Sequence, residues 1–237
     1  MITLAFDSTA KVASVAITDG ERALAISSID NGLTQSELLL PMAEDLLKSL
    51  KLSFSDVELL ACSVGPGSFT GVRIGAALVK GIAFANNIPC APVSTLRALA
   101  ENLSGIEGII VPAMDARRSQ LYCALFEYKD GEMVRLTDDL AIPISELAEL
   151  LSEHKGKSIY IVGDGYEVAR RELSRLGVKL SETPKLLRDE NAYSVARVGE
   201  QMYLSGECVT DSALQPTYLR VPQAERERLE RLKAENK

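Results

Sequence analysis

Short apolar runs divided by turn residues fill the first third of the chain, with two longer runs of helical period among them. The short runs, each predicted to be a strand, cover residues 2–6, 12–18, 23–29 and 57–64. Asp19-Gly20 separates the second run from the third, and two strands joined by Asp-Gly are a strong signal of a β-hairpin. Residues 36–50 and 72–85 repeat apolar side chains every three to four positions, which predicts two helices.

The same order of elements returns in the middle of the chain. Apolar runs cover residues 109–114, 121–128 and 133–136, then a helical run covers 144–151 and a further strand is expected at 158–162. In each copy the first strand ends in an aspartate, Asp7 or Asp115, and the meander turns at an Asp-Gly pair, at 19–20 or 130–131. This repeat predicts an α/β fold of two lobes, each of βββαβα type with a mixed sheet.

Polar breaks set the expected boundaries. Residues 102–105, Asn-Leu-Ser-Gly, follow a predicted helix at 95–100, and a further helix is expected at 192–204. Beyond it, Glu227 and Arg231 are spaced to pair on a solvated helix, with a partner-binding tail as the alternative. The expected units are an N-terminal lobe at 1–103, a smaller C-terminal lobe at 104–190, a closing helix and segment at 191–222, and a charged tail at 223–237.

Composition narrows the class of protein. With 46% hydrophobic and 25% charged residues the chain has an ordinary soluble composition, and no apolar stretch is long enough to span a bilayer. The first residues lack a basic segment, which favours a strand over a signal peptide, so a cytoplasmic protein is expected. The net charge of −7 argues against a chain that holds nucleic acid by itself, because such binding depends on Lys and Arg.

Residues suited to metal binding or nucleophilic catalysis are few. The four cysteines, Cys62, Cys90, Cys123 and Cys208, include no Cys-x-x-Cys pair and are predicted to be reduced and structural. The single histidine, His154, lies in a polar stretch, so neither a zinc site nor a serine triad can be assembled. No catalytic residue and no metal site are expected.

A glycine-rich run, GPGSFTGVRIG at residues 65–75, joins a predicted strand to a predicted helix. A phosphate site is one reading, because unpaired N–H groups gather at such a corner. A Walker A loop would need Lys-Ser/Thr where Val72 and Arg73 stand, and the glycine spacing does not match a dinucleotide fingerprint. The alternative is a tight turn that lets a helix start close to a strand. The candidate residues of the loop are Gly65, Gly67, Ser68, Thr70 and Gly71.

Two predicted helices carry more apolar surface than one sheet can cover. Apolar residues extend over about 200° of the helix at 36–50, and the helix at 72–85 has only two charged side chains. Either both helices lie inside their own lobe, or they also face another protein in a helix bundle. Helical geometry places Ile74, Leu78 and Ile82 toward the core. The candidate partner interface comprises Leu38, Met42, Arg73, Ala76, Ala77, Lys80 and Phe84.

As a family signature the glycine-rich run is much more specific. It resembles the TsaB (YeaZ) family, which is related to TsaD and the M22 glycoprotease-like group. The resemblance covers all but the last residues, and Gln35 stands where the family commonly has His, which removes any metal role there. The further matching motifs are Asp7-Ser8-Thr9, Gln35-Ser36-Glu37 to Pro41, 114–118 (Met-Asp-Ala-Arg-Arg), Gly163-Asp164-Gly165 and 216–220 (Pro-Thr-Tyr-Leu-Arg).

The resemblance implies the two-lobe fold of the actin-like ATPase (ASKHA) superfamily, in which ATP lies between the lobes and a closing segment returns to the first lobe. It implies a vestigial nucleotide cleft formed by Asp7, Ser8, Thr9, Asp115, Gly163, Asp164 and Gly165. Because Arg117-Arg118 follows Asp115 and no Walker lysine is present, no cofactor is expected, and any nucleotide binding in the cleft or at a partner interface is expected to be weak.

The resemblance also implies a function. The chain is expected to be a non-catalytic subunit that activates a TsaD-like catalytic partner. That partner transfers a threonylcarbamoyl group to N6 of the adenine beside the tRNA anticodon. A TsaE-like ATPase is expected to join the pair, a homodimer to form in isolation, and contact with tRNA to be indirect. The alternatives are an ATP-dependent small-molecule kinase, which needs nucleotide and magnesium near Asp7 and Asp115, or an M22-type peptidase, which needs more metal ligands than one histidine supplies.

Overall fold

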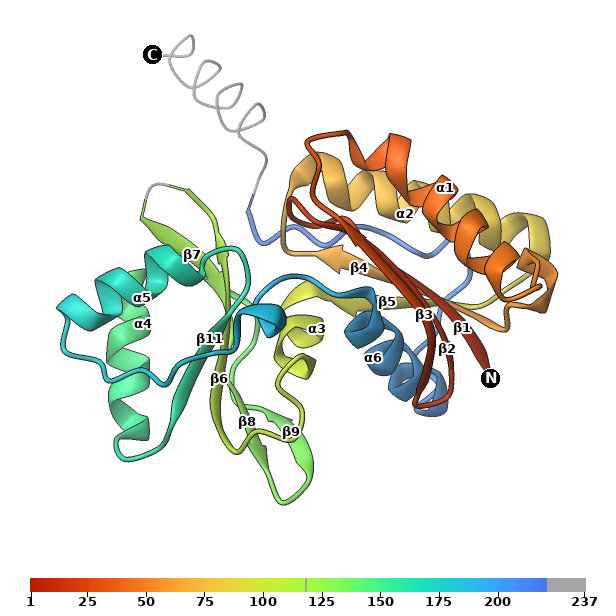
Figure 1. Cartoon of the computed structure of the whole chain (residues 1–237). Coiled ribbons are helices and arrows are strands. Elements are labelled where there is room, and N and C mark those ends of the chain that lie inside the picture. Colours follow the sequence, from red (N-terminus) through yellow and green to blue (C-terminus); the bar gives the residue numbers. More distant parts are fainter. Residues whose placement is uncertain (118, 221–237) are drawn as a thin grey trace, which may run out of the picture.

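The computed structural model describes residues 1–117 and 119–220, which form two lobes with a closing segment between them (Figure 1). The first lobe comprises β1 (Ile2–Asp7), β2 (Ala13–Asp19), β3 (Arg22–Ile29), α1 (Gln35–Ser49), β4 (Leu59–Gly65), α2 (Phe69–Asn86) and β5 (Cys90–Ser94). The second comprises β6 (Gly108–Asp115), β7 (Gln120–Cys123), β8 (Phe126–Lys129), β9 (Glu132–Arg135), β10 (Leu140–Pro143), α4 (Ile144–Leu151), β11 (Ile159–Val162) and α5 (Tyr166–Arg175). Helices α3 (Thr95–Glu101) and α6 (Ala192–Leu204) complete the fold, and 3-10 turns lie at Phe54–Asp56, Ser152–His154 and Lys185–Leu187.

The first sheet has the strand order β3-β2-β1-β4-β5, in which β1 is antiparallel to β2 and parallel to β4. Helices α1 and α2 cover one face, where their apolar side chains share a core with Leu4 and Phe6 of β1. Helix α6 covers the other face, which is lined by small residues such as Ala5 and Ala61. A Cβ on Gly199 of α6 would lie 2.6 Å from that of Ala61, so glycine is what permits this close approach.

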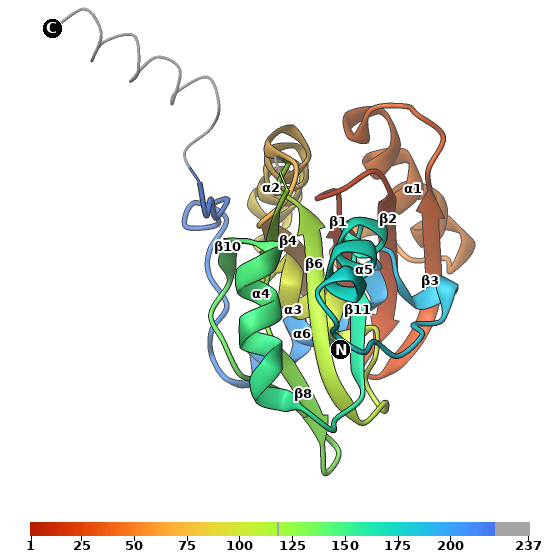
Figure 2. The same ribbon diagram turned by 90° about the vertical axis from the view of Figure 1, so that its left-hand side faces the viewer.

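The second sheet repeats this pairing around β6. Strand β6 is parallel to β11 and antiparallel to both β7 and β8, and β8 is antiparallel to β9. Helices α4 and α5 pack together on one face, which Figure 2 shows turned toward the viewer with the first lobe behind. The order of elements is that of the first lobe, with β7 and β8 in place of one strand and with β10 added, so the predicted α/β fold of two duplicated lobes is confirmed.

The single strand predicted at 121–128 is wrong. It is divided into β7 and β8, because the chain leaves the ladder at Ala124-Leu125, where Leu125 N–H donates to Thr137 Oγ1 at 2.9 Å. Both halves still pair with β6. The interruption therefore leaves the pairing with β6 unchanged.

Helix α3 lies between the lobes (Figure 1) and contacts both cores. Ala98 packs with the small residues of the first sheet, whereas Leu96 and Leu99 pack with residues of the second, among them Phe126. After α3, Asn102 Nδ2 donates to the carbonyl of Asp189 at 2.8 Å, which ties the end of this helix to the chain just before α6. The division of the chain into units at these positions stays a prediction.

In the described part of the chain, no helix combines the length and the apolar character needed to cross a membrane.

Candidate functional site

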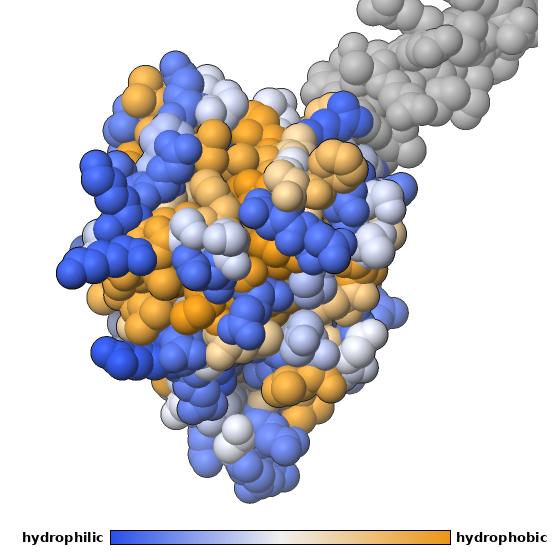
Figure 3. All heavy atoms as spheres, turned by 90° about the vertical axis from the view of Figure 1, so that its right-hand side faces the viewer, coloured by the Kyte–Doolittle hydropathy of each residue, from blue (hydrophilic) through white to orange (hydrophobic). Residues whose placement is uncertain are grey.

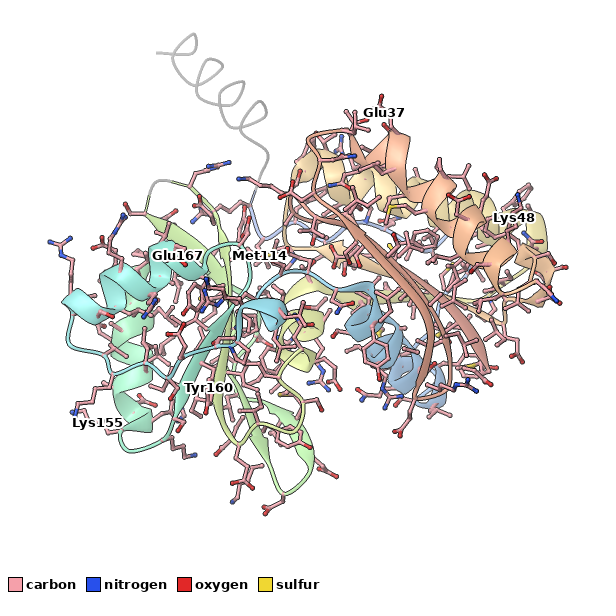
Figure 4. All side chains as sticks on the ribbon, viewed as in Figure 1. Glu37, Lys48, Met114, Lys155, Tyr160 and Glu167 are labelled. Carbon is pink, nitrogen blue, oxygen red and sulfur yellow. The ribbon has the colours of Figure 1, made fainter. Side chains whose placement is uncertain are left out.

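A cleft of about 450 Å³ lies between the lobes. Met114, at the end of β6, reaches the junction between the lobes and lines the cleft, as Figure 4 shows. The lining as a whole comes from residues 9–11, 66–69, Val72, 114–117, Tyr122, Asp164 and 217–220. The cleft therefore brings together the turn after β1, the glycine-rich loop, the turn after β6 and the closing segment.

Asp7 lies behind the wall of this cleft and does not line it. It is 1% exposed, and its Oδ1 accepts hydrogen bonds from Thr9 N–H at 2.9 Å and Thr9 Oγ1 at 2.7 Å. Ser63 Oγ donates to its Oδ2 at 2.6 Å. Burial raises the pKa of the Asp7 carboxyl, and these hydrogen bonds oppose that rise. The placement of Asp7 in an open nucleotide cleft is corrected, because both oxygens already have partners inside the first lobe.

The glycines of the run at 65–75 allow α2 to start directly against the turn after β1. A Cβ on Gly71 would lie 1.9 Å from the carbonyl oxygen of Ser8, and one on Gly75 would lie 2.5 Å from Ser8 Oγ. Ser8 Oγ donates to the carbonyl of Gly71 at 2.9 Å. Ser8 is therefore buried under α2 and does not line the cleft, contrary to its predicted role. The packing therefore supports the interpretation of the loop as a tight turn that lets a helix start close to a strand.

Two N–H groups at the N-terminus of α2 already have partners inside the first lobe. Ser68 N–H donates to the carbonyl of Thr9 at 2.7 Å, and Gly71 N–H donates to Ser68 Oγ, the N-cap, at 3.2 Å. Gly67 sits close against Thr9, since a Cβ there would lie 2.6 Å from the Thr9 carbonyl oxygen. Thr70 is exposed and does not line the cleft.

The second lobe supplies Asp115 and Asp164 to the cleft. Asp115 N–H donates to Asp164 Oδ1 at 3.0 Å, and the Asp115 carboxylate accepts from Arg117 N–H at 2.8 Å and lies 3.4 Å from Arg117 Nη1. Desolvation by the surrounding protein raises the pKa of Asp164; the hydrogen bond from Asp115 N–H opposes that rise, and the charge of the Asp115 carboxylate adds to it. Arg117 thus forms an exposed ion pair with the Asp115 carboxylate. Arg118 lies outside the described residues.

Gly163 and Gly165 shape the loop after β11 without lining the cleft. A Cβ on Gly163, whose φ is +101°, would lie 2.4 Å from the carbonyl oxygen of Ala113, and Gly165 N–H donates to that same oxygen at 2.9 Å. These glycines let the loop dock on β6. Their predicted place in the cleft wall is therefore corrected, whereas Asp164 between them does line it.

The residues present do not fit a magnesium–nucleotide site. Asp7 is enclosed by hydroxyl and N–H partners, and Asp115 is paired with Arg117. Within residues 1–117 and 119–220, no group of three His, Cys, Asp or Glu side chains is arranged to hold a metal ion.

Two residues that matter here were missed as site residues. Gln35 Nε2 donates to the carbonyls of Ala10 at 3.1 Å and Lys11 at 3.2 Å, so it holds the turn that lines the cleft. Glu190 is only 3% exposed, and one of its oxygens has no partner. Burial raises the pKa of Glu190 well above its ordinary value, with Asp7 adding to the rise. Their roles depend on residues distant in sequence, which local patterns do not reveal.

The outer surface of α2 matches its predicted stripe in part. Arg73 and Ala77 are exposed, Phe84 is 80% exposed, and Lys80 Nζ donates to the carbonyl of Leu214 at 3.2 Å. Ile82, on the opposite side, is buried. Figure 3, which faces the outer side of the first lobe, shows apolar residues spread among hydrophilic ones.

Leu38, Met42 and Ala76 were wrongly assigned to the interface. They are 9%, 6% and 2% exposed, because α1 and α2 pack side by side on the sheet and turn these side chains inward. The apolar excess of the two helices is thus satisfied partly inside the lobe. The exposed remainder of α1 includes Leu40, at 38% exposure.

Comparison with known proteins identifies the family. The model of the TsaD family, tRNA N6-adenosine threonylcarbamoyltransferase, matches residues 34–226. The tRNA threonylcarbamoyladenosine biosynthesis protein TsaB of Bacillus subtilis is 30% identical over 187 residues, which cover 78% of this chain and 80% of that protein. The chain belongs to the TsaB family.

Other relatives agree with this placement in the TsaB family. The TsaB protein of Haemophilus influenzae is 25% identical over 229 residues, with 92% of each chain covered. The structure of YeaZ from Pseudomonas aeruginosa superposes with a TM-score of 0.76 at 26% identity, covering 92% of this chain and 99% of that one. The likeness extends over both lobes, so the predicted family membership is confirmed.

Proposed function

We propose that this chain takes part in tRNA threonylcarbamoyladenosine biosynthesis as a non-catalytic subunit that binds and activates a TsaD-like catalytic partner. Its relatives are named for that biosynthesis. The observation that carries the non-catalytic part is the enclosure of Asp7, whose two carboxylate oxygens accept hydrogen bonds from Thr9 and Ser63. Because Asp7 is also buried and does not line the cleft, it is poorly placed to position a nucleotide's metal ion.

Other reactive groups are equally unsuited to catalysis. Burial raises the pKa of Cys90 to about 11 and that of Cys123 to about 12, so neither thiol ionises near neutral pH. Asp115 is paired with Arg117, and nucleotide binding in the cleft is accordingly proposed to be weak or absent. The chemistry, including any metal, is assigned to the partner.

The outer stripe of α2 is the surface we assign to that partner. Ala77 and Gly81 present little more than backbone, and a Cβ on Gly81 would meet nothing within 4 Å. A glycine inside a helix costs about 1 kcal/mol relative to alanine, and the isolated fold shows no steric need for it here. Small residues next to an exposed Phe84 suit close packing of a helix from another subunit. We propose that a TsaD-like chain binds this surface of α2. When the TsaD-like chain is absent, a second copy of this chain is proposed to bind there.

Two further parts of the proposal follow from family membership and charge. A TsaE-like ATPase is proposed to join the complex. Contact with tRNA is proposed to be made mainly by the partner, because this chain has a net charge of −7.

Reconstitution tests the function directly. Purified chain alone is expected to show neither peptidase nor tRNA-modifying activity, and modification should appear when the TsaD-like partner, the ATPase, and the substrates are added. Omitting this chain from the full mixture serves as the control and should abolish or strongly reduce modification. Robust turnover by the chain in isolation would contradict a non-catalytic role.

A further inference from the structure

Residues 217–220, which we call the strap, line the interlobe cleft and contact both lobes. On the first lobe, Thr217 N–H donates to the carbonyl of Val64, at the end of β4, at 2.7 Å. A Cβ on Gly65 would lie 2.4 Å from the Thr217 carbonyl oxygen, so the strap is seated tightly against this glycine. The start of the strap is thereby fixed to the first sheet.

An aromatic and cationic cluster attaches the strap to α2. The rings of Tyr218 and Phe69 are 5.2 Å apart, and the guanidinium of Arg73 lies 3.7 Å from the centre of the Phe69 ring. Arg73 Nε donates to the Tyr218 hydroxyl at 2.7 Å. Stacking and a charge-assisted hydrogen bond act on the same side chain, so Tyr218 is held to the first turns of α2.

Arg220 attaches the strap to the second lobe. Its Nη1 donates to the carbonyl of Ala116 at 3.4 Å, its Nη2 donates to Gln120 Oε1, and its guanidinium lies 5.6 Å from the centre of the Tyr122 ring. The side chain is half-buried. The strap therefore has an anchor on each lobe, with only Leu219 between Tyr218 and Arg220.

We propose that the strap holds the two lobes in one orientation and links the surface of α2 to the second lobe. Two residues of extended chain span at most about 7 Å, so the anchors at Tyr218 and Arg220 leave little slack. Movement at one anchor must either move the other or break its hydrogen bonds. Arg73 stands on the exposed stripe of α2, so a subunit bound there would act on the strap; this last link alone rests on the proposed function.

The distance between the lobes tests the strap in the chain alone. Lys48 in α1 and Lys155 in the second lobe are exposed and lie toward opposite ends of the molecule (Figure 4), so Lys48→Cys and Lys155→Cys can carry spin labels. Cys208 would be replaced by Ser, since the other three cysteines are buried. Arg220→Ala is expected to broaden the distance distribution, whereas Arg171→Ala, an exposed arginine on α5, should leave it narrow. A distribution that Arg220→Ala leaves unchanged would overturn the proposal.

Hydrogen exchange supplies a second test that does not depend on Arg220. Arg73→Ala weakens the anchor on the first lobe by removing the hydrogen bond to the Tyr218 hydroxyl, and the readout is the exchange of the Ala116 and Gln120 amides on the second. If the strap transmits the change, these amides should exchange about tenfold faster, which corresponds to the loss of one charge-assisted hydrogen bond. Faster exchange confined to the first lobe would show that Arg73 stabilises only its own surroundings. Because neither test includes a partner, failure of the proposed function leaves both results interpretable.

Discussion

Asp7 shows how a residue in a family motif can become structural. Its carboxylate accepts hydrogen bonds from Thr9 and from Ser63, on the neighbouring strand, and it is almost fully buried. The side chain therefore connects β1, the turn that lines the cleft and β4. Its importance to this chain is expected to appear in stability and only indirectly in function.

Replacement of Asp7 tests that view. Asp7→Ala leaves the Thr9 and Ser63 donors without an acceptor, so the free energy of unfolding should fall by about 1–3 kcal/mol. Asp7→Asn keeps an acceptor oxygen and should cost less. Urea unfolding of both variants measures the difference. If alanine and asparagine prove equally harmless, the hydrogen bonds to Asp7 contribute nothing to the fold.

Glu190 gives stability a dependence on pH. Its pKa in the folded chain is raised well above the ordinary value of 4.5 by burial and by Asp7 and Asp164, so the folded state binds its proton more tightly than the unfolded state. The resulting stabilisation is complete below the ordinary value and is lost as pH rises through the raised one. Glu190→Gln, which stays neutral, should therefore lose less stability than the parent as pH rises above 4.5. Thermal melts of both chains across that pH range measure the difference. Equal losses of stability in the parent and in Glu190→Gln would contradict a buried, protonated Glu190.

At the scale of elements, patterns of apolar residues predicted where helices and strands lie along the chain. They predicted less well which other elements each helix packs against. The helix at 192–204 was placed correctly, whereas α2 begins at Phe69, before the predicted start, because Ser68 caps it. Leu38 and Met42 were assigned to a partner surface but pack inside the lobe. Periodicity tells which side of a helix is apolar, but not whether another helix of the same chain already covers that side.

Two glycines of α2 make a matched pair with opposite expected effects. Gly71→Ala would place a Cβ 1.9 Å from a backbone oxygen, which must shift, so the fold should lose about 1–3 kcal/mol. Gly81→Ala meets nothing within 4 Å and should stabilise the isolated chain by about 1 kcal/mol. The same change should weaken binding of the TsaD-like partner. Melts of the two variants and a titration with partner measure these effects, and a Gly81→Ala chain that binds as tightly as the parent would remove this glycine from the interface.

At the scale of the whole molecule, the duplicated lobes and the family were predictable, but the contacts across the cleft were not. The repeat of strand order and the Asp-Gly turns indicated two lobes, and the motif at 65–75 indicated the family. Arg220 and Ala116, in contrast, are 104 positions apart, and their hydrogen bond follows only from the relative placement of the lobes. The enclosure of Glu190 depends on the same placement. Such contacts leave no local pattern of apolar and polar residues.

The central claim is that this chain works by binding a catalytic partner through α2, and Ala77→Glu tests it most directly. Buried in an interface without a counter-charge, the new carboxylate should weaken the complex by about 3 kcal/mol or more, a factor of about 100 in Kd. Ser174→Glu adds the same charge at an exposed position of α5 and serves as the control. Sedimentation with the TsaD-like partner should show the complex with Ser174→Glu and not with Ala77→Glu, while both chains melt like the parent. An Ala77→Glu chain that melts normally and still binds the partner as the parent does would contradict the account.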